Sequence, residues 1–182
     1  MNDVKRMDVI SLLGPLRRYA RSLTRDEAQA EDLVQDALVR AYEHKASFRP
    51  GGNLRSWLLS ILHNAFIDNR RRRIAELRRL EQAAELAETA AVPDQESRVR
   101  LQQIQAAFMS LPDEQRAALH LVAIEGLSYQ EAATALKIPI GTLMSRLGRA
   151  RATLRDFEAG HDRPGEPSAK RPGLRIVGGS DV

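Results

Sequence analysis

Almost every residue from Val9 to Phe157 stands in a helix-forming pattern of apolar and polar positions, and no segment alternates with a sustained period of two. Such spacing predicts amphipathic helices rather than strands. Gly and Pro act as punctuation between the periodic runs, so they mark where helices end. The predicted fold class is therefore all-α.

The N-terminal part divides into three predicted helices, over residues 8–23, 26–44 and 53–77. The second helix carries acids at its N-terminal end, where the helix dipole favours negative charge. Residues 47–52 contain Pro and Gly and predict a loop, after which Asn53 is placed to cap the third helix. Together these elements predict a compact helical domain over residues 1–79.

The C-terminal part predicts a second small helical domain, over residues 98–157. Its first helices cover about 96–109 and 112–126, with Pro in the first turn of the latter and Gly at its end. Residues 80–97 are acidic and have few large apolar side chains, so they predict a flexible or partly helical linker. Residues 158–182 have the composition of a disordered tail, in which 174–177 is either a short docking segment or inert.

A helix-turn-helix is predicted over residues 127–155. Ser128 can cap the first of its helices, and Glu131 can reach back to complete a capping box. Pro139 ends that helix and pre-sets the entry to the next, which begins near Ile140. The alternative is a solvated basic helix in a small bundle.

The second helix of this motif has an apolar side and a polar side. Its packing residues are Leu143, Leu147, Ala150 and Leu154. The opposite side consists of Ser145, Gly148 and Arg149, with Thr142 and Arg146 at the flank. Since Arg can read guanine and Ser or Thr can contact bases or phosphate, this helix is predicted to enter the DNA major groove.

Charge changes the picture because it is concentrated, although the formal net charge is only +4. Residues 70–79 hold six Arg and one Glu, and residues 140–155 hold four Arg and no acid. Two separate basic patches predict two contacts with a polyanion. Residues 26–36 hold five acids and no base, which argues against a phosphate contact there.

No catalytic or cofactor chemistry stands out. The chain has no cysteine, and its four histidines lack metal-ligand spacing, so neither a metal nor another cofactor is predicted. There is no phosphate-binding GK[ST] loop and no catalytic triad or paired-carboxylate arrangement. The N-terminus lacks an apolar run long enough for a signal peptide or membrane insertion, which predicts a cytoplasmic protein that is not an enzyme.

Three stretches together resemble one family: AEDLVQDALVRAY (30–42), NLRSWLLSILHNAFIDNRRRR (53–73) and LPDEQRAALHLVAIEGLSYQEAATALKIPIGTLMSRLGRAR (111–151). The chain resembles the bacterial extracytoplasmic-function (ECF) sigma factors, which carry only sigma-70 regions 2 and 4 joined by a linker. LRRYARSL and LPDEQR are similar to alphaproteobacterial members, including the general-stress group.

The resemblance implies that the second helix docks on the coiled coil of the RNA polymerase β′ subunit. The residues it assigns to polymerase binding are Asp32, Leu33, Gln35 and Asp36. The two acids and the glutamine share one helical face by their spacing. From this segment alone, a solvated acidic face would be the alternative.

The resemblance also places the minus-ten promoter contact on the loop and helix that follow. The assigned residues are Phe48, Asn53, Asn64, Arg70, Arg71, Arg72 and Arg73. An aromatic ring can stack on a base, amides can bond to a base edge, and arginines can follow phosphates. Trp57 lies in an apolar stripe and is predicted to be core.

In the C-terminal domain the resemblance assigns minus-thirty-five contacts to Thr142, Ser145, Arg146 and Arg149. Met144 and Gly148 depart from a common family pattern. The polymerase β-flap would bind an apolar surface around Leu119, Leu121, Val122 and Ile124.

The sequence thus predicts a sigma factor whose partners are core RNA polymerase, promoter DNA and an anti-sigma factor. The alternatives are a dimeric helix-turn-helix regulator that acts without polymerase docking, and a helical adaptor that binds only protein. The motif of residues 30–42 argues against the regulator.

Overall fold

The computed structural model describes residues 2–80 and 99–161, and every regular element within these ranges is helical. The all-α prediction is confirmed for this part of the chain. The predicted linker beyond Leu80 and the predicted tail from residue 162 onward, including 174–177, lie outside the described residues.

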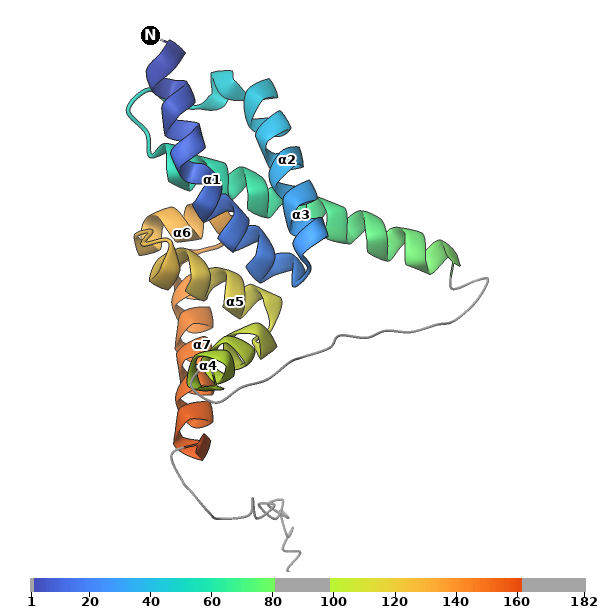
Figure 1. Cartoon of the computed structure of the whole chain (residues 1–182), viewed down its shortest axis with the longest axis vertical. Helices are drawn as coiled ribbons and strands as arrows, with labels where there is room; N and C mark the ends of the chain where they lie inside the picture. Colours follow the sequence, from blue (N-terminus) through green and yellow to red (C-terminus); the bar gives the residue numbers. More distant parts are fainter. Residues whose placement is uncertain (1, 81–98, 162–182) are drawn as a thin grey trace, which may run out of the picture.

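Helices α1 (Asn2–Thr24), α2 (Glu27–Glu43) and α3 (Leu54–Leu80) form the N-terminal bundle. All three pack against one another, and the C-terminal end of α3 projects away from the others (Figure 1). Their buried sides are apolar, so the hydrophobic effect holds the bundle together. The residues at its centre include Leu16, Tyr19, Leu33, Ala37, Leu59 and Leu62.

Side-chain caps set the helix boundaries of this bundle. Asp26 accepts a hydrogen bond from the Gln29 amide at 2.8 Å and so begins α2. Asn53 accepts one from the Ser56 amide at 3.1 Å and so begins α3, as predicted. Between α2 and α3 lie a short 3-10 turn, η1 (Lys45–Ser47), and a loop in which Gly51 adopts a φ of +80°. A side chain would be strained at that position.

The C-terminal bundle consists of α4 (Val99–Ser110), α5 (Asp113–Leu119), η2 (His120–Ile124), α6 (Tyr129–Leu136) and α7 (Ile140–His161). The helix predicted over 112–126 is divided, because η2 has π-helical geometry. Wider turns of this kind occur frequently at functional sites. Here the turn ends with a bond from the Glu125 amide to the His120 carbonyl at 3.0 Å.

The predicted helix-turn-helix is confirmed as α6 and α7. Ser128 accepts a bond from the Glu131 amide at 3.2 Å, and the Glu131 carboxylate accepts one from the Ser128 amide at 2.9 Å. This pair is the capping box expected from the sequence. After Lys137, which has a φ of +53°, the chain turns at Pro139 and α7 begins.

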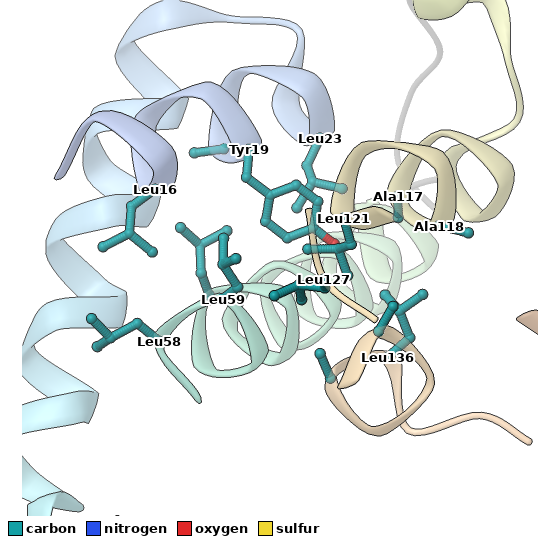
Figure 2. Packing of buried hydrophobic residues seen from close by; sticks show 14 of the residues in the cluster. Leu16, Tyr19, Leu23, Leu58, Leu59, Ala117, Ala118, Leu121, Leu127 and Leu136 are labelled. Atoms are coloured by element: carbon teal, nitrogen blue, oxygen red, sulfur yellow. The ribbon is translucent and has the colours of Figure 1, made fainter. Parts of the chain in front are cut away.

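The two bundles pack against each other through one apolar core. Figure 2 shows Leu16, Tyr19, Leu23, Leu58 and Leu59 of the N-terminal bundle facing Ala117, Ala118, Leu121, Leu127 and Leu136 of the C-terminal bundle. The sequence predicted two domains and a linker, but it did not predict this contact. The apolar faces that meet here are, by their periodicity, ordinary core faces of each bundle.

Candidate nucleic-acid interface

Helix α7 presents the polar side predicted for DNA binding. Leu143, Leu147 and Ala150 are fully buried and fix the helix on the bundle. Ser145 and Arg149 are exposed on the opposite side. The side of α7 that carries the predicted base contacts is therefore open to solvent.

The other two residues assigned to the minus-thirty-five contact lie at the edge of this surface. Thr142 is half-buried, and its carbonyl accepts a hydrogen bond from the Ser145 hydroxyl at 2.9 Å. Arg146 forms an ion pair with Glu114 of α5, with 2.6 Å between Nη2 and Oε2. Arg146 must exchange this carboxylate for DNA before it can contact a base or phosphate.

The loop before α3 holds Phe48 against protein. The ring of Phe48 is half-buried and lies 5.2 Å from the ring of Trp57, centroid to centroid. Trp57 packs on the apolar core, as predicted. Asn64, farther along α3, donates from Nδ2 to the carbonyl of Ser60 at 2.7 Å. In this structure the ring of Phe48 and the amide of Asn64 are both in contact with the protein itself.

The arginine run at the end of α3 is divided in the same way. Arg70 pairs with Asp113 of α5 at 3.0 Å, and Arg73 donates to the Gln29 side chain at 3.1 Å. Arg71 and Arg72 are exposed on the projecting part of the helix. These two guanidinium groups are available to phosphates without any rearrangement.

Helix α2 carries the predicted polymerase face, with one correction. Asp32 and Gln35 are exposed, whereas Leu33 is only 3% exposed and belongs to the core, so its side chain cannot contact a partner. Asp36 is half-buried and accepts a hydrogen bond from Arg40 at 2.9 Å. Hydrogen bonds from Arg40 to Asp36 and to Asp68 raise the pKa of the guanidinium.

Two exposed apolar residues on α2 escaped the sequence analysis. Val39 is 57% exposed and Tyr42 is 71% exposed. With Asp32 and Gln35 they follow the i, i+3, i+7, i+10 spacing of one helical face, which is the signal that could have found them. Large exposed apolar side chains next to acids are typical of a protein-binding surface.

The apolar surface predicted around η2 is mostly core. Leu119 and Leu121 are buried, Val122 is half-buried, and Ile124 is exposed. Only Ile124 of this set offers a large apolar surface to a partner. The assignment of Leu119 and Leu121 to a binding surface is therefore corrected.

A buried carboxylate lies between the two bundles. Glu125, directly after η2, is 1% exposed and accepts hydrogen bonds from Arg55 of α3 and, at 3.3 Å, from Arg18 of α1. Nε2 of His120 lies 3.2 Å from the same carboxylate. Burial alone would raise the pKa of Glu125, but hydrogen bonds from His120 and Arg55 and the charge of Arg18 outweigh it and lower the pKa.

Two of the predicted minus-ten residues bond to the C-terminal bundle. Asn53 donates to the carboxylate of Glu131 at 2.6 Å, and Arg70 pairs with Asp113. Asp113 also lies 3.5 Å from Arg25 and 2.7 Å from the buried Arg116. Acids of α5 and α6 thus occupy groups that were predicted to face DNA.

Aromatic and imidazole rings fill the centre of the contact between the bundles. The Tyr19 hydroxyl lies 2.9 Å from Nδ1 of His63, and the Tyr19 ring packs on His120. Burial, together with the charges of Arg146 and Lys137, lowers the pKa of His63 to about 4. Burial also raises the pKa of Tyr19 far above its ordinary value, so the phenol stays protonated.

Neither a membrane helix nor a metal-binding cluster is seen in the described part of the chain. Among the helices of residues 2–80 and 99–161, none combines the length and the apolar character needed to cross a membrane. These residues also contain no group of three or more His, Asp or Glu side chains that could hold a metal ion.

Comparison with known proteins assigns both bundles. Residues 9–75 match the family model of Sigma-70 region 2, and residues 101–154 match that of Sigma-70, region 4. The ECF RNA polymerase sigma factor EcfG of Rhodopseudomonas palustris is 37% identical over 155 residues, which covers 85% of this chain and 84% of EcfG. The chain is an ECF sigma factor.

Solved structures of sigma factors have the same arrangement of helices. The sigma factor RpoE of Bartonella quintana, in complex with the anti-sigma factor NepR, matches with a TM-score of 0.73 at 35% identity. That match covers 87% of this sigma factor and 98% of RpoE. CnrH, in complex with the cytosolic domain of CnrY, matches with a TM-score of 0.60 at 27% identity and covers 85% and 86% of the two chains.

The resemblance predicted from the sequence is thereby confirmed. In this sigma factor the N-terminal bundle is region 2, and the C-terminal bundle is region 4. The exposed stripe of α2 and the loop before α3 belong to region 2, and α7 belongs to region 4.

Proposed function

We propose that this sigma factor binds core RNA polymerase, directs it to a two-part promoter and assists strand opening, without catalysing a reaction itself. It acts in the cytoplasm. The observation that carries the proposal is that one chain exposes both an acidic-apolar stripe on α2 and a basic polar side on α7. A protein-binding face and a DNA-binding face are both needed to bring an enzyme to a promoter.

The polymerase face consists of Asp32, Gln35, Val39 and Tyr42, with Asp36 at its edge. Its proposed partner is the β′ coiled coil. Acids on this face set the register and the association rate with a basic partner. The exposed valine and tyrosine add apolar area that is removed from water on docking. On region 4, Ile124 is the candidate contact for the β-flap.

The minus-ten contact is proposed for the loop and helix that contain Phe48, Asn53 and Asn64, followed by the arginines Arg70, Arg71, Arg72 and Arg73. A flipped base needs a pocket with a stacking surface and polar groups for its edge. The ring of Phe48 and the amide of Asn53 lie near the same loop, on either side of Gly51. Arg71 and Arg72 extend the site along the displaced strand.

The minus-thirty-five contact is proposed for α7, through Thr142, Ser145, Arg146 and Arg149. Arg149 is placed to make a bidentate contact with guanine, and Ser145 to contact a base or phosphate. Met144 is 55% exposed beside them and gives the helix an apolar group that can contact a thymine methyl.

An anti-sigma factor is the proposed regulatory partner. RpoE of Bartonella quintana was solved in complex with the anti-sigma factor NepR, and this chain shares its fold and 35% of its sequence. The exposed apolar residues of α2 offer such a partner a binding surface.

Reversal of one charge tests the polymerase face. Asp32→Lys should leave the free energy of unfolding within about 0.5 kcal/mol of the parent, since Asp32 is exposed. The same variant should lose most of its affinity for core polymerase. Asp36 is unsuitable for this test, because a lysine there would face Arg40.

The matched control is Asp156→Lys, an equal change of charge at an exposed position on α7. If Asp32→Lys competes for core polymerase as well as this control does, the proposed docking face is wrong. A dimeric helix-turn-helix regulator would bind its DNA without polymerase. Mapping of transcripts started by the reconstituted holoenzyme on a promoter library separates that alternative from a sigma factor.

A further inference from the structure

The contact between regions 2 and 4 engages residues that the proposed function needs elsewhere. Asn53 bonds to Glu131 and Arg70 pairs with Asp113, so region 4 occupies part of the minus-ten site. The argument that follows rests on the proposed function. DNA and region 4 compete for the same two side chains.

Promoter geometry gives a second reason why this arrangement must change. Elements named minus ten and minus thirty-five lie about 25 base pairs apart, or roughly 85 Å at 3.4 Å per base pair. Here α3 and α6 pack directly on each other, and both regions share one apolar core. Two regions joined in this way cannot read both elements, so they must separate on the promoter.

Charged groups hold the contact closed on both sides of its apolar core. Glu125 of region 4 is buried against Arg18 and Arg55 of region 2. Arg116 of region 4 is fully buried and donates from Nε to the carbonyl of Ser22 at the end of α1. Removing one partner of such a buried pair leaves an uncompensated charge, which is strongly unfavourable.

The contact also borders the proposed polymerase face. Asp32 of α2 and Asp113 of α5 line the same cleft, which has a volume of about 360 Å³ and includes Leu33, Phe66 and Arg70. A partner that docks on α2 therefore arrives next to the place where region 4 is seated. Docking of polymerase and release of region 4 can be coupled at this edge.

We propose that the packing of region 4 on region 2 is an autoinhibitory clasp, centred on Glu125 between Arg18 and Arg55, which keeps the free sigma factor closed until core polymerase opens it. The closed form withholds Asn53 and Arg70 from DNA. Affinity for core polymerase is then reduced in proportion to the small fraction of open molecules.

The double variant Arg18→Ala/Arg55→Ala tests the clasp from the region 2 side. The side chains of Arg18 and Arg55 are 53% and 34% exposed, so their truncation does not open the core of either bundle. Arg17→Ala is the matched control, because Arg17 is 49% exposed but pairs with Glu31 inside region 2. The chain has no cysteine, so spin labels can be placed at Ala28→Cys and Ala106→Cys, two exposed positions in different regions.

The expected result is a shift of the label-to-label distance to longer values in the double variant and no shift in the Arg17→Ala control. If the open fraction rises from about 1% to about 10%, affinity for core polymerase rises about tenfold. Transcription from holoenzyme that is already formed should match the parent. Adding Glu125→Gln to the double variant removes the unpaired charge and should return the distance toward that of the parent.

Unchanged distances in the double variant would overturn the clasp. Longer distances with unchanged affinity for core polymerase would overturn its autoinhibitory role, as would a failure of Glu125→Gln to restore the parent distance. If the parent chain itself does not bind core polymerase, the proposed function is wrong and this inference falls with it. The parent measurement therefore distinguishes the two failures.

Discussion

The two helices proposed to read the promoter use their polar side chains differently. On α7, Arg149 is exposed while a buried apolar row fixes the helix from behind. On α3 and at its cap, Asn53 bonds to Glu131, Asn64 bonds to a carbonyl of its own helix, and Arg70 pairs with Asp113. The minus-thirty-five site is therefore largely preformed, whereas the minus-ten site must be released before it can bind.

This difference separates two requirements of promoter recognition. A helix that reads duplex DNA benefits from a rigid seat, because its side chains are then held in register with the major groove. A site for unpaired bases is needed only after the duplex opens. If its groups are occupied by Glu131 and Asp113, the free protein is kept from binding single strands at random.

Loss of the rigid seat of α7 should have the largest effect. Leu147→Ala removes a side chain that is 1% exposed and leaves a cavity under the helix. We expect the free energy of unfolding to fall by about 2 to 5 kcal/mol, measured by urea denaturation. Met144→Ala, at an exposed position of the same helix, should stay within about 0.5 kcal/mol of the parent. Equal losses in both variants would mean that α7 is not seated as described.

Removal of the exposed guanidinium of α7 should affect binding and leave stability unchanged. Arg149→Ala should cost about 1 to 3 kcal/mol at the matched minus-thirty-five site and relax the preference at one base position. Transcription by the holoenzyme from a promoter library measures this preference. A variant that ranks every minus-thirty-five sequence as the parent does would exclude Arg149 as a base-reading residue.

The seat of α3 against region 4 should respond to pH through His63. Its pKa is lowered to about 4 in the folded protein, against about 6.5 in an unfolded chain. The neutral form therefore supports the fold fully above about pH 6.5, and this support is lost as the pH falls toward 4. Between about pH 7 and pH 5 the loss should be about 2 kcal/mol in the free energy of unfolding.

The variant His63→Gln should show a much smaller change over the same interval. Glu125 and Glu131 also have lowered pKa values, so their contributions are lost only at lower pH, as it falls below the ordinary range of a carboxyl group. An equally steep loss in His63→Gln and in the parent would mean that His63 is not the group that titrates.

The smallest effect concerns the arginines of α3. Arg71 and Arg72 are exposed, so their replacement by Ala should reduce the salt dependence of DNA binding by about 0.7 to 0.9 in log-log slope per lost contact. Arg70→Ala should leave the slope of the free chain unchanged, because Arg70 is paired with Asp113, and should lower that of the holoenzyme. If Arg70 and Arg71 behave alike in the free chain, Arg70 is not withheld from DNA.

Local features of this fold could be predicted from the sequence because they depend on near neighbours. The caps at Asn53 and Ser128 and the buried row of α7 each follow from residues within a few turns of one helix. Apolar periodicity likewise marks which side of a helix packs. It does not distinguish an exposed contact residue from a core residue at the edge of a stripe, which is why Leu33 was misassigned.

The state of the minus-ten site could not be predicted in this way. The bonds from Asn53 to Glu131 and from Arg18 to Glu125 join residues 78 and 107 positions apart. Nothing in the local sequence of either partner specifies the other. The π-helical turn that precedes Glu125 is also set by tertiary packing, because residues 120–124 have an ordinary helical pattern.

Binding of two DNA fragments tests the contrast between α3 and α7 most directly. The fragments are the minus-thirty-five duplex and the minus-ten single strand of a promoter found by transcript mapping, each measured with the free chain and with the holoenzyme. We expect the free chain to bind the duplex but hardly the single strand, and the holoenzyme to bind both with sequence preference. If the free chain binds the minus-ten strand as tightly as the holoenzyme does, region 4 does not withhold the minus-ten site and the account is wrong.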